Sequence, residues 1–248
     1  MMASRDPLGE RKHFEAVVAR RGALYWAERT VAGKRRRDLR AERILSAAEQ
    51  TAGHLDRMLE IGCGTGEYTR ALAVGTAATL VAIDVTPAAL ALRGGPWPPQ
   101  VWFAAGDVER LPFADGTFDA VIGNAVLHHL RLEHAVPEIV RVLRPAGALV
   151  FAEPNMLNPQ VALERNVRWI GRLLDNSPDE TAFIRWRLSR TLRGLGVVDV
   201  RIRPFDFLYP LTPRPLIPLV ERMGRVCERI PLVAEVAGSL LVTGIRPA

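Results

Sequence analysis

Cysteine and lysine are both scarce in this chain of 248 residues. The two cysteines, Cys63 and Cys227, do not suggest a disulfide framework or a zinc site. Lys12 and Lys34 are the lysines, so arginine supplies nearly all of the positive charge behind the formal net charge of +6. This bias is typical of a GC-rich bacterial genome and is weak support for a nucleic-acid partner. The excess charge can still favour acidic substrates through long-range steering.

Long apolar runs are missing as well. No stretch approaches the roughly 18 residues that are needed to span a bilayer, and the first residues lack the apolar centre of a signal peptide. We therefore expect a cytoplasmic protein. The length and the apolar content of 48% suit one α/β domain with elaborations.

The central motif is MLEIGCGTGEYT, residues 58–69. It predicts a buried strand that runs into a glycine-rich turn, where Gly62, Gly64 and Gly66 let the backbone approach a ligand closely because no Cβ intervenes. A helix over 67–74 follows, and its N-terminal amides can bind a negative group. The motif therefore predicts a ligand site at the end of the first strand.

The glycine spacing discriminates between ligands. The dinucleotide fingerprint is GxGxxG, whereas this chain has GxGxG, with Glu60 before it and Glu67 after it. Two carboxylates would repel a pyrophosphate, but they suit a ligand that carries an ammonium and a sulfonium group. A second predicted strand, over 79–83, ends in Asp84 about 20 residues after the first glycine, where an acid is the expected partner of ribose hydroxyls.

Strand and helix patterns then alternate along the chain. Further strands are predicted over 101–105, 118–122 and 148–152, with helices over 87–92 and 133–143. This order predicts a parallel sheet with helices on both faces and with ligands at the carboxyl ends of the strands. Polar residues of interest fall at these ends: Glu60, Asp84, Asp107, Asn124 and Glu153.

The first 55 residues are predicted to be helical and polar, with the clearest helix over 38–50 and a stop at Gly53. Their basic run, residues 34–37, is either a nucleic-acid contact or a solvated helix start with ion-pair partners at Asp38 and Glu42.

The last third of the chain departs from the alternating pattern. Helices are predicted over 161–174, 180–195 and 219–228, and strands over 197–203 and 238–247. Between them, PFDFLYPLTPRPLIP is too rich in proline to be regular structure throughout.

The glycine turn, Asp84 and the segment GDVERLPFADGTFD, residues 106–119, resemble the class I S-adenosylmethionine-dependent methyltransferases, in the small-molecule branch called methyltransferase type 11. The resemblance implies a Rossmann-like α/β fold with a mostly parallel seven-stranded sheet. It divides the single domain into a helical lid (1–55), a cofactor-binding core (56–153) and a cap of helices with the last two strands (154–248). S-adenosylmethionine would be the cofactor and S-adenosylhomocysteine its product, and no metal is predicted.

The resemblance also implies roles for individual residues. Asp107 and the Val108 amide match the positions that meet the adenine, Asp84 would bind the ribose and Asn124 would lie near the sulfonium; for the two acids the alternative is loop capping. Cys63 fills a space that needs a small residue. The implied cofactor-binding set is Glu60, Gly62, Cys63, Gly64, Gly66, Asp84, Val85, Asp107, Val108 and Asn124.

A hydroxyl acceptor benefits from a general base, most often a histidine. We expect His129 to be that base with Glu153 orienting it, and His128 is a further catalytic candidate; alternatively, the histidines pack beneath the site. Four aromatic residues of the lid and the cap are expected to contact the acceptor, although those of the cap would alternatively only cover the sheet edge: Tyr25, Trp26, Phe207 and Tyr209.

Together these features predict transfer of a methyl group from S-adenosylmethionine to a hydroxyl of a small organic acceptor, such as a sugar, a lipid or a secondary metabolite. Methylation on nitrogen or carbon is the nearest alternative. An RNA-modifying enzyme and a protein that binds the cofactor without turnover are alternatives of another class. No DNA partner is expected, because no Pro-Pro-aromatic tetrapeptide follows the fourth strand. A homodimer stays open.

Overall fold

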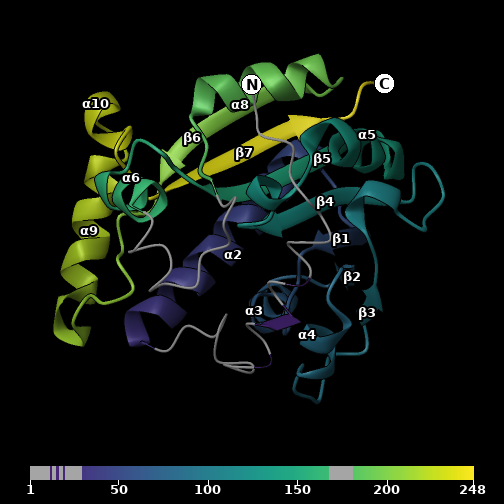
Figure 1. Ribbon diagram of the computed structural model, residues 1–248, viewed down its shortest axis with the longest axis horizontal. Coiled ribbons are helices and arrows are strands. Elements are labelled where there is room, and N and C mark those ends of the chain that lie inside the picture. Colours follow the sequence, from purple (N-terminus) through teal and green to yellow (C-terminus); the bar gives the residue numbers. More distant parts are fainter. Residues whose placement is uncertain (1–11, 13–14, 17–18, 20–29, 168–180) are drawn as a thin grey trace.

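The structure is a computed structural model that describes residues 12, 15–16, 19, 30–167 and 181–248. A seven-stranded sheet runs through it with the strand order β3-β2-β1-β4-β5-β7-β6 (Figure 1). β1 to β5 pair in parallel, whereas β7 runs antiparallel to both β5 and β6. The predicted mostly parallel sheet is therefore confirmed. The strands are β1 (Arg57–Ile61), β2 (Thr79–Asp84), β3 (Val101–Ala105), β4 (Phe118–Asn124), β5 (Leu143–Pro154), β6 (Val198–Phe205) and β7 (Ser239–Ile245).

Helices cover both faces of this sheet, as the alternating pattern predicted. The α-helices of the described residues are α2 (Val31–Ala52), α3 (Glu67–Val74), α4 (Pro87–Ala91), α5 (Leu132–Val142), α6 (Pro159–Asn166), α8 (Arg185–Gly194), α9 (Ile217–Cys227) and α10 (Pro231–Ala234). Short 3₁₀ turns are η2 (Val108–Arg110), η3 (Leu127–His129) and η4 (Arg214–Leu216).

Successive strand residues enter two separate apolar cores because side chains alternate across a sheet. Leu59 and Val121 point to the face that α5 and α8 cover, and Met58 and Ile122 point to the face that α2 and α3 cover. Full burial of an aliphatic side chain stabilises a fold by about 1.5–3 kcal/mol. The central strands are thus fixed from both sides, which makes their carboxyl ends a rigid base for a site.

The chain order reverses between β1 and β4. β1 pairs with β2 on one side and with β4 on the other, and Glu60 lies opposite Ile122 in the register. In open α/β sheets the crevice at such a switch point is where ligands bind. The glycine turn after β1 and Asn124 at the end of β4 therefore flank the same crevice.

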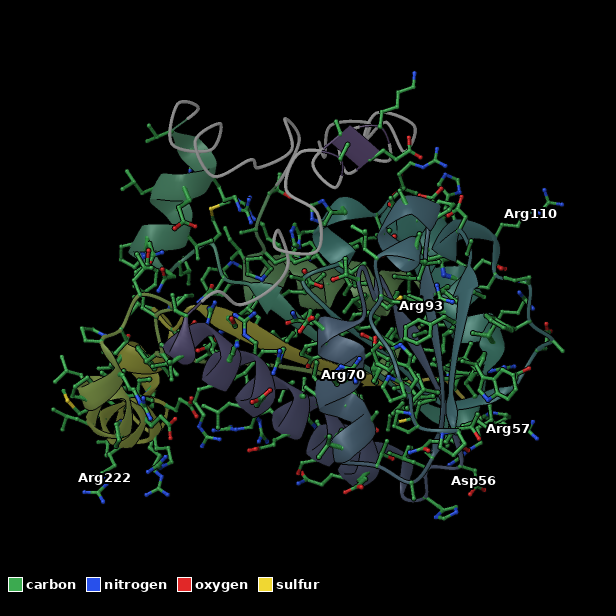
Figure 2. The ribbon with its side chains drawn as sticks, turned by 90° about the horizontal axis from the view of Figure 1, so that it is seen from below. Asp56, Arg57, Arg70, Arg93, Arg110 and Arg222 are labelled. Carbon is green, nitrogen blue, oxygen red and sulfur yellow. The ribbon has the colours of Figure 1, made fainter. Side chains whose placement is uncertain are left out.

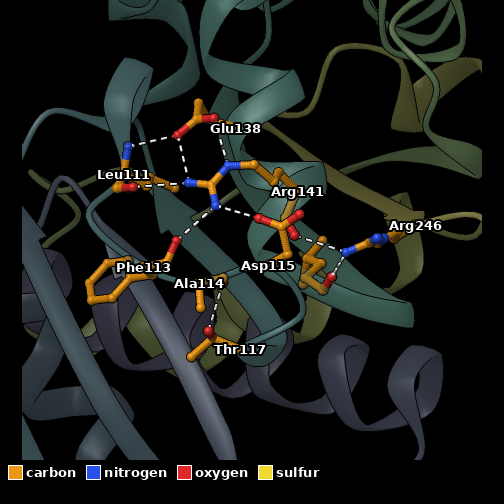
Figure 3. A network of polar contacts seen from close by, with 9 residues as sticks. Leu111, Phe113, Ala114, Asp115, Thr117, Glu138, Arg141 and Arg246 are labelled. Carbon is orange, nitrogen blue, oxygen red and sulfur yellow. Dashed lines mark hydrogen bonds and ion pairs between the residues drawn. The ribbon is translucent and has the colours of Figure 1, made fainter.

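Arg141 of α5 braces the loop between η2 and β4. Its guanidinium pairs with Glu138 and Asp115, at 2.8 Å each, and donates to the Leu111 carbonyl at 2.9 Å (Figure 3). Glu138 also accepts the Leu111 amide at 2.8 Å. The hydrogen bonds that Arg141 donates to Glu138 and Asp115 raise its pKa above the usual range. The loop that leads into the central strand β4 is thereby held in one conformation.

Several elements differ from the predicted ranges; α8, for example, begins at Arg185, five residues later than the helix predicted from residue 180. α2 begins at Val31, seven residues earlier than expected, with Thr30 as a cap that accepts the Gly33 amide at 2.9 Å.

β5 begins at Leu143, inside the segment that was expected to close the preceding helix. Its pairing with β4 shifts register there, and Ala146 has a φ of 60°. The first residues of β5 therefore join the sheet through a bulge, and Pro145 and Gly147 lie within the strand without ending it.

Candidate active site

Five polar residues gather at the carboxyl edge of the sheet. Glu60 is in β1, Asp84 ends β2, Asn124 ends β4 and Glu153 lies one residue before the end of β5. Asp107 follows β3 and caps η2. The sequence predicted this placement, and the parallel pairing of β1 to β5 brings it about.

The glycine turn leaves no room for side chains at two of its positions. Gly62 has a φ of +71°, and a Cβ there would lie 2.6 Å from Val126 Cγ2. Gly66 has a φ of +81°, and a Cβ there would lie 2.8 Å from the Trp97 ring. Both positions therefore require glycine. Val126, in the turn after β4, and Trp97, in the 94–100 loop, thus pack directly on the backbone of the glycine turn.

Asp84 ties the turn to the end of β2. One of its carboxylate oxygens accepts the Gly64 amide and the other accepts the Thr86 amide, each at 2.8 Å. Burial raises the pKa of Asp84. Each oxygen keeps further lone pairs that can accept hydroxyl donors. Val85, which follows, is 41% exposed, so it offers an apolar surface beside this acid.

Asp107 accepts the Glu109 amide at 2.9 Å, so it does cap a loop. The side chain of Val108 is buried in the main core. Only its backbone is available to a ligand, which agrees with the backbone role that was expected at this position. A capping carboxylate still has an oxygen free to accept a ligand amine.

Buried polar atoms without a partner lie beneath the glycine turn. Glu60 is 1% exposed. Among the described residues, no hydrogen-bond partner is found for Oε2 of Glu60 or for the hydroxyls of Thr65 and Tyr68. The Thr69 hydroxyl lies close enough to Glu60 to lower the pKa of its carboxyl. Buried atoms without a partner are unfavourable in an empty protein. Together with the glycine turn above them, they are suited to a polar ligand with an ammonium group.

Burial raises the pKa of Glu60 to about 8. In the unfolded chain this carboxyl ionises near its ordinary value, so the folded state binds the extra proton between about pH 4.5 and 8. The stability of the fold should therefore fall as the pH rises through this window. Glu60→Gln removes the titration, and we expect it to exceed the wild type in stability at pH 8 by on the order of 1–4 kcal/mol.

Urea unfolding of both proteins across this range checks that prediction, with Glu49→Gln on the exposed side of α2 as the matched control. Parallel stability curves for the wild type and Glu60→Gln would contradict it.

Trp97 is a site residue that the sequence did not reveal. Its ring packs on Gly66, meets Phe103 edge-on with 4.7 Å between ring centroids, and lies 4.0 Å from the guanidinium carbon of Arg70. The 94–100 segment was predicted only as a loop, because its prolines and glycines indicate no partner. The contact with Gly66 joins segments 31 positions apart, which no local pattern encodes.

Glu153 binds His128, so the expected pairing of Glu153 with His129 is wrong. One Glu153 oxygen accepts the amides of Val126 and Leu127, at 3.0 and 2.8 Å, and the other lies 2.7 Å from Nδ1 of His128. Glu153 and His128 are each 1% exposed. The turn after β4 coils into η3, which directs the first histidine of the pair toward β5.

His129 is half-buried, and its ring centroid lies 4.1 Å from that of His128. The two rings therefore form a stack in which Glu153 holds the inner ring and the outer ring is nearer to solvent.

A second network ties Asn124 to α2 and the cap. Arg40 donates to Asn124 Oδ1 at 3.3 Å, to Asp206 at 2.8 Å and also to Ser239. Arg36 donates to the same Asp206 oxygen at 2.7 Å. Although burial opposes it, the charges of Arg40 and Arg36 lower the pKa of Asp206. A buried carboxylate thus fixes both arginines, and through Arg40 it fixes the side chain at the end of β4.

The basic run lies within α2, and its arginines form ion pairs with acidic residues of the same chain. Arg35 binds Glu221 of α9 at 2.7 Å and lies 3.9 Å from Glu42, one of the two predicted partners. Arg37 binds Asp38, the other predicted partner, at 2.8 Å. These contacts favour the reading of this segment as a helix start over a nucleic-acid contact.

The aromatic residues expected to contact the acceptor are placed only in part. Tyr25 and Trp26 lie outside the described residues. Phe207 packs against Gly224 of α9, where an added Cβ would lie 3.3 Å from the Phe207 Cβ. Tyr209 is 42% exposed. Phe207 therefore packs within the cap, against α9. Its contact with an acceptor stays a prediction.

A polar hollow of about 930 Å³ lies at the opposite, amino edge of the sheet, lined by residues such as His54, Asp56 and Asp119. Asp119 is committed there to the amides of Asp56 and Arg57 and to Arg144. The hollow is thus lined by groups that hold the strand entries together, and it is separate from the carboxyl edge.

Comparison with known proteins agrees with this geometry. A family model described as a methyltransferase domain matches residues 59–151, which contain the glycine turn and four of the five polar residues; Glu153 lies just beyond the matched region. A demethylmenaquinone methyltransferase of Mycolicibacterium vanbaalenii is 42% identical over 169 residues, which cover 60% of this chain and 71% of that protein. A malonyl-[acyl-carrier protein] O-methyltransferase of Halorhodospira halophila is 35% identical over 116 residues, covering 45% of this chain and 39% of that protein.

Among solved structures, a chain of the complex between the Haloferax volcanii Trm112 methyltransferase activator and a methyltransferase superposes with a TM-score of 0.59 at 20% identity, covering 88% of this chain and 96% of that one. This likeness shows the fold. Several curated relatives are longer than the matched region, since the chain spans 39 to 59% of their length.

Proposed function

The chain belongs to the family of class I S-adenosylmethionine-dependent methyltransferases, and we propose that it transfers a methyl group from this cofactor to a hydroxyl of a small organic acceptor. The observation that carries the proposal is the glycine turn at Gly62 and Gly66, tied to β2 by Asp84 and underlain by unpartnered buried polar atoms. Relatives named as methyltransferases of quinones and of a malonyl thioester support a small acceptor.

The residues present fit this cofactor. Glu60 beneath the turn would receive the ammonium of the methionine part, and the positive charge would favour its ionised form. Asp84 would accept the two ribose hydroxyls, in charge-assisted hydrogen bonds that are stronger than neutral ones. The Asp107 carboxylate and the Val108 amide would hold the adenine, with Val85 as an apolar neighbour.

Cys63 in the glycine turn and Asn124 at the end of β4 contribute by size and position. Cys63 is buried, and burial raises the pKa of its thiol, so it stays neutral and packs against Ala82 and Leu90. Asn124 would face the sulfonium, held in place by Arg40. When bound, the cofactor supplies an activated methyl group, and much of the rate acceleration comes from holding the acceptor in line with it.

His129 would accept the proton of the acceptor hydroxyl. It is the more exposed ring of the histidine stack, whereas His128 is fixed from below by Glu153. His128 and Glu153 would then act as positioning residues that hold His129 and the turn after β4. This division differs from the sequence-based expectation, in which Glu153 contacted the base itself.

Carbon methylation of a quinone-like ring is a second candidate. It is favoured by the demethylmenaquinone methyltransferase that is 42% identical to this chain. Removing a proton from a ring hydroxyl makes the neighbouring ring carbon nucleophilic, so a histidine base would serve this reaction as well. The two candidates differ in the atom that receives the methyl group.

Methyl transfer to a panel of reduced quinones, acyl carboxylates and sugar hydroxyls tests both candidates, with a donor labelled in its methyl group. We expect label in one acceptor class, and the carbon or oxygen position is then read by nuclear magnetic resonance. His129→Ala should lower kcat about 100- to 10,000-fold without changing cofactor affinity. His134→Ala, on the exposed side of α5, is the matched control.

Full activity of His129→Ala would show that His129 is not the general base. A protein that binds the cofactor but labels no acceptor would favour the alternative of binding without turnover.

A further inference from the structure

One face of the cap exposes many large apolar side chains. They come from η4, α9, α10 and the turns between them, and they lie at one end of the molecule (Figure 1). We call this surface the α9–α10 face. Its apolar residues are Leu216 (47% exposed), Leu219 (54%), Met223 (58%), Val226 (57%), Ile230 (46%), Leu232 (87%), Val233 (37%) and Val236 (40%).

The apolar residues of α9 form a stripe on the outside of the helix. Leu219, Met223 and Val226 are four and then three positions apart, which places them on one side. The opposite side is the one that packs on the protein, through Ile217 and Gly224. α9 is thus apolar on two sides. Among the described residues, only the side with Ile217 and Gly224 packs against the rest of the protein.

The charges around this stripe are of one sign. Arg214, Arg222, Arg225 and Arg229 are all exposed. None of Arg214, Arg222 and Arg229 forms an ion pair with a described residue, and Arg225 makes only a 4.0 Å contact with Glu221. Arg222 projects outward from this end of the molecule, while Arg57 and Arg110 lie at the other end (Figure 2).

The acids of the same segment point the other way. Glu221 pairs with Arg35, Glu228 with Arg43 and Glu235 with Arg185, at 2.7 to 2.8 Å. All three acids between residues 211 and 236 are therefore tied to α2 or α8 and do not neutralise the outer arginines. The α9–α10 face combines a surface of apolar side chains with an uncompensated positive charge.

We propose that the α9–α10 face binds the surface of an anionic lipid bilayer. An amphipathic helix with an apolar stripe and flanking arginines lies in the plane of such an interface, with its apolar side chains among the acyl chains and its cations on lipid phosphates. Within the described ranges, no helix is both long and apolar enough to cross a bilayer. The contact is therefore peripheral.

A second copy of this chain suits the face less well. A twofold interface would place the same patch against itself, so the four arginines of each copy would be buried against four like charges. Like charges that meet in an interface oppose association. The charge pattern thus favours a negatively charged partner surface over self-association.

Flotation of the full chain with lipid vesicles tests the proposal, and it needs no methyl transfer, so its outcome is independent of the proposed reaction. Vesicles of phosphatidylcholine alone are compared with vesicles that also contain phosphatidylglycerol. We expect binding to the anionic vesicles, weakened by salt. Arg222→Gln with Arg225→Gln should lower the partition coefficient by about 30-fold, since each cation near the surface contributes roughly fivefold.

Leu219→Ser with Met223→Ser should also reduce binding. Controls of the same kind at other surfaces, Val74→Ser on α3 and Arg57→Gln with Arg110→Gln, should bind as the wild type does. Circular dichroism of each variant confirms that it is folded.

Three results would overturn the proposal. One is a folded wild type that does not float with anionic vesicles or that binds neutral vesicles equally well. Another is an equal loss of binding in the control variants. The third is a dimer, seen by sedimentation, that the Met223 variant dissociates, because the face would then be an interface between copies.

Discussion

Asp206→Ala should destabilise the fold by about 3–5 kcal/mol, because it removes the buried carboxylate that the partly buried guanidinium groups of Arg36 and Arg40 share. The Asp206 side chain is only 5% exposed, so water cannot replace it in the native structure. The same change also frees Arg40 from one of its anchors, and with it the side chain of Asn124. Urea unfolding measures the loss.

The matched control for this change is Glu221→Ala, which removes another tie between α2 and the cap. Arg35, its partner, is 43% exposed, so we expect a loss below about 1 kcal/mol. An Asp206→Ala protein within 1 kcal/mol of the wild type would mean that the two arginines find water, and the network would then be unimportant for the fold.

Asp84→Ala should weaken binding of S-adenosylmethionine by about 100-fold or more. It removes two acceptors for hydroxyl donors, each a hydrogen bond to a charged group worth about 1.5–3 kcal/mol. It also releases the Gly64 amide, so the glycine turn loses its tie to β2. Calorimetric titration measures the affinity, and Asp56→Ala, at the opposite edge of the sheet, is the control (Figure 2).

Unchanged cofactor affinity in Asp84→Ala would show that this carboxylate only holds the turn. The cofactor would then have to be bound by other residues of the edge, and the assignment of Asp84 would be withdrawn.

Local patterns predicted most of the fold and brought together the residues of the candidate site. The glycine spacing, the acid at the end of β2 and the apolar strands are each encoded within about ten residues, because turn geometry and side-chain alternation depend on near neighbours. For this reason the ranges of α3 and β3 were predicted as they are observed.

Contacts between distant segments were not predictable in the same way. Arg40 and Asp206 are 166 positions apart, and nothing in either neighbourhood identifies the other. The sequence placed Arg40 only in a predicted helix over 38–50 and Asp206 only in a proline-rich segment. Tertiary packing of α2 against the cap decides which of these charges become buried partners.

The pattern of residue types could not predict which of the two adjacent histidines binds Glu153. Both histidines were identified as candidates, but the coil of the turn after β4 decides which ring faces Glu153. That turn is shaped by Glu153 itself, which accepts the amides of Val126 and Leu127. The choice between two adjacent residues therefore depends on a contact made across the sheet.

Calorimetric titration of the purified wild type with S-adenosylmethionine, S-adenosylhomocysteine and NADH tests the cofactor assignment most directly. We expect the first two to bind with dissociation constants in the micromolar range, about −8 kcal/mol, and NADH not to bind. A folded protein that binds neither methyl-transfer ligand, or that binds NADH instead, would contradict the assignment and every site role that follows from it.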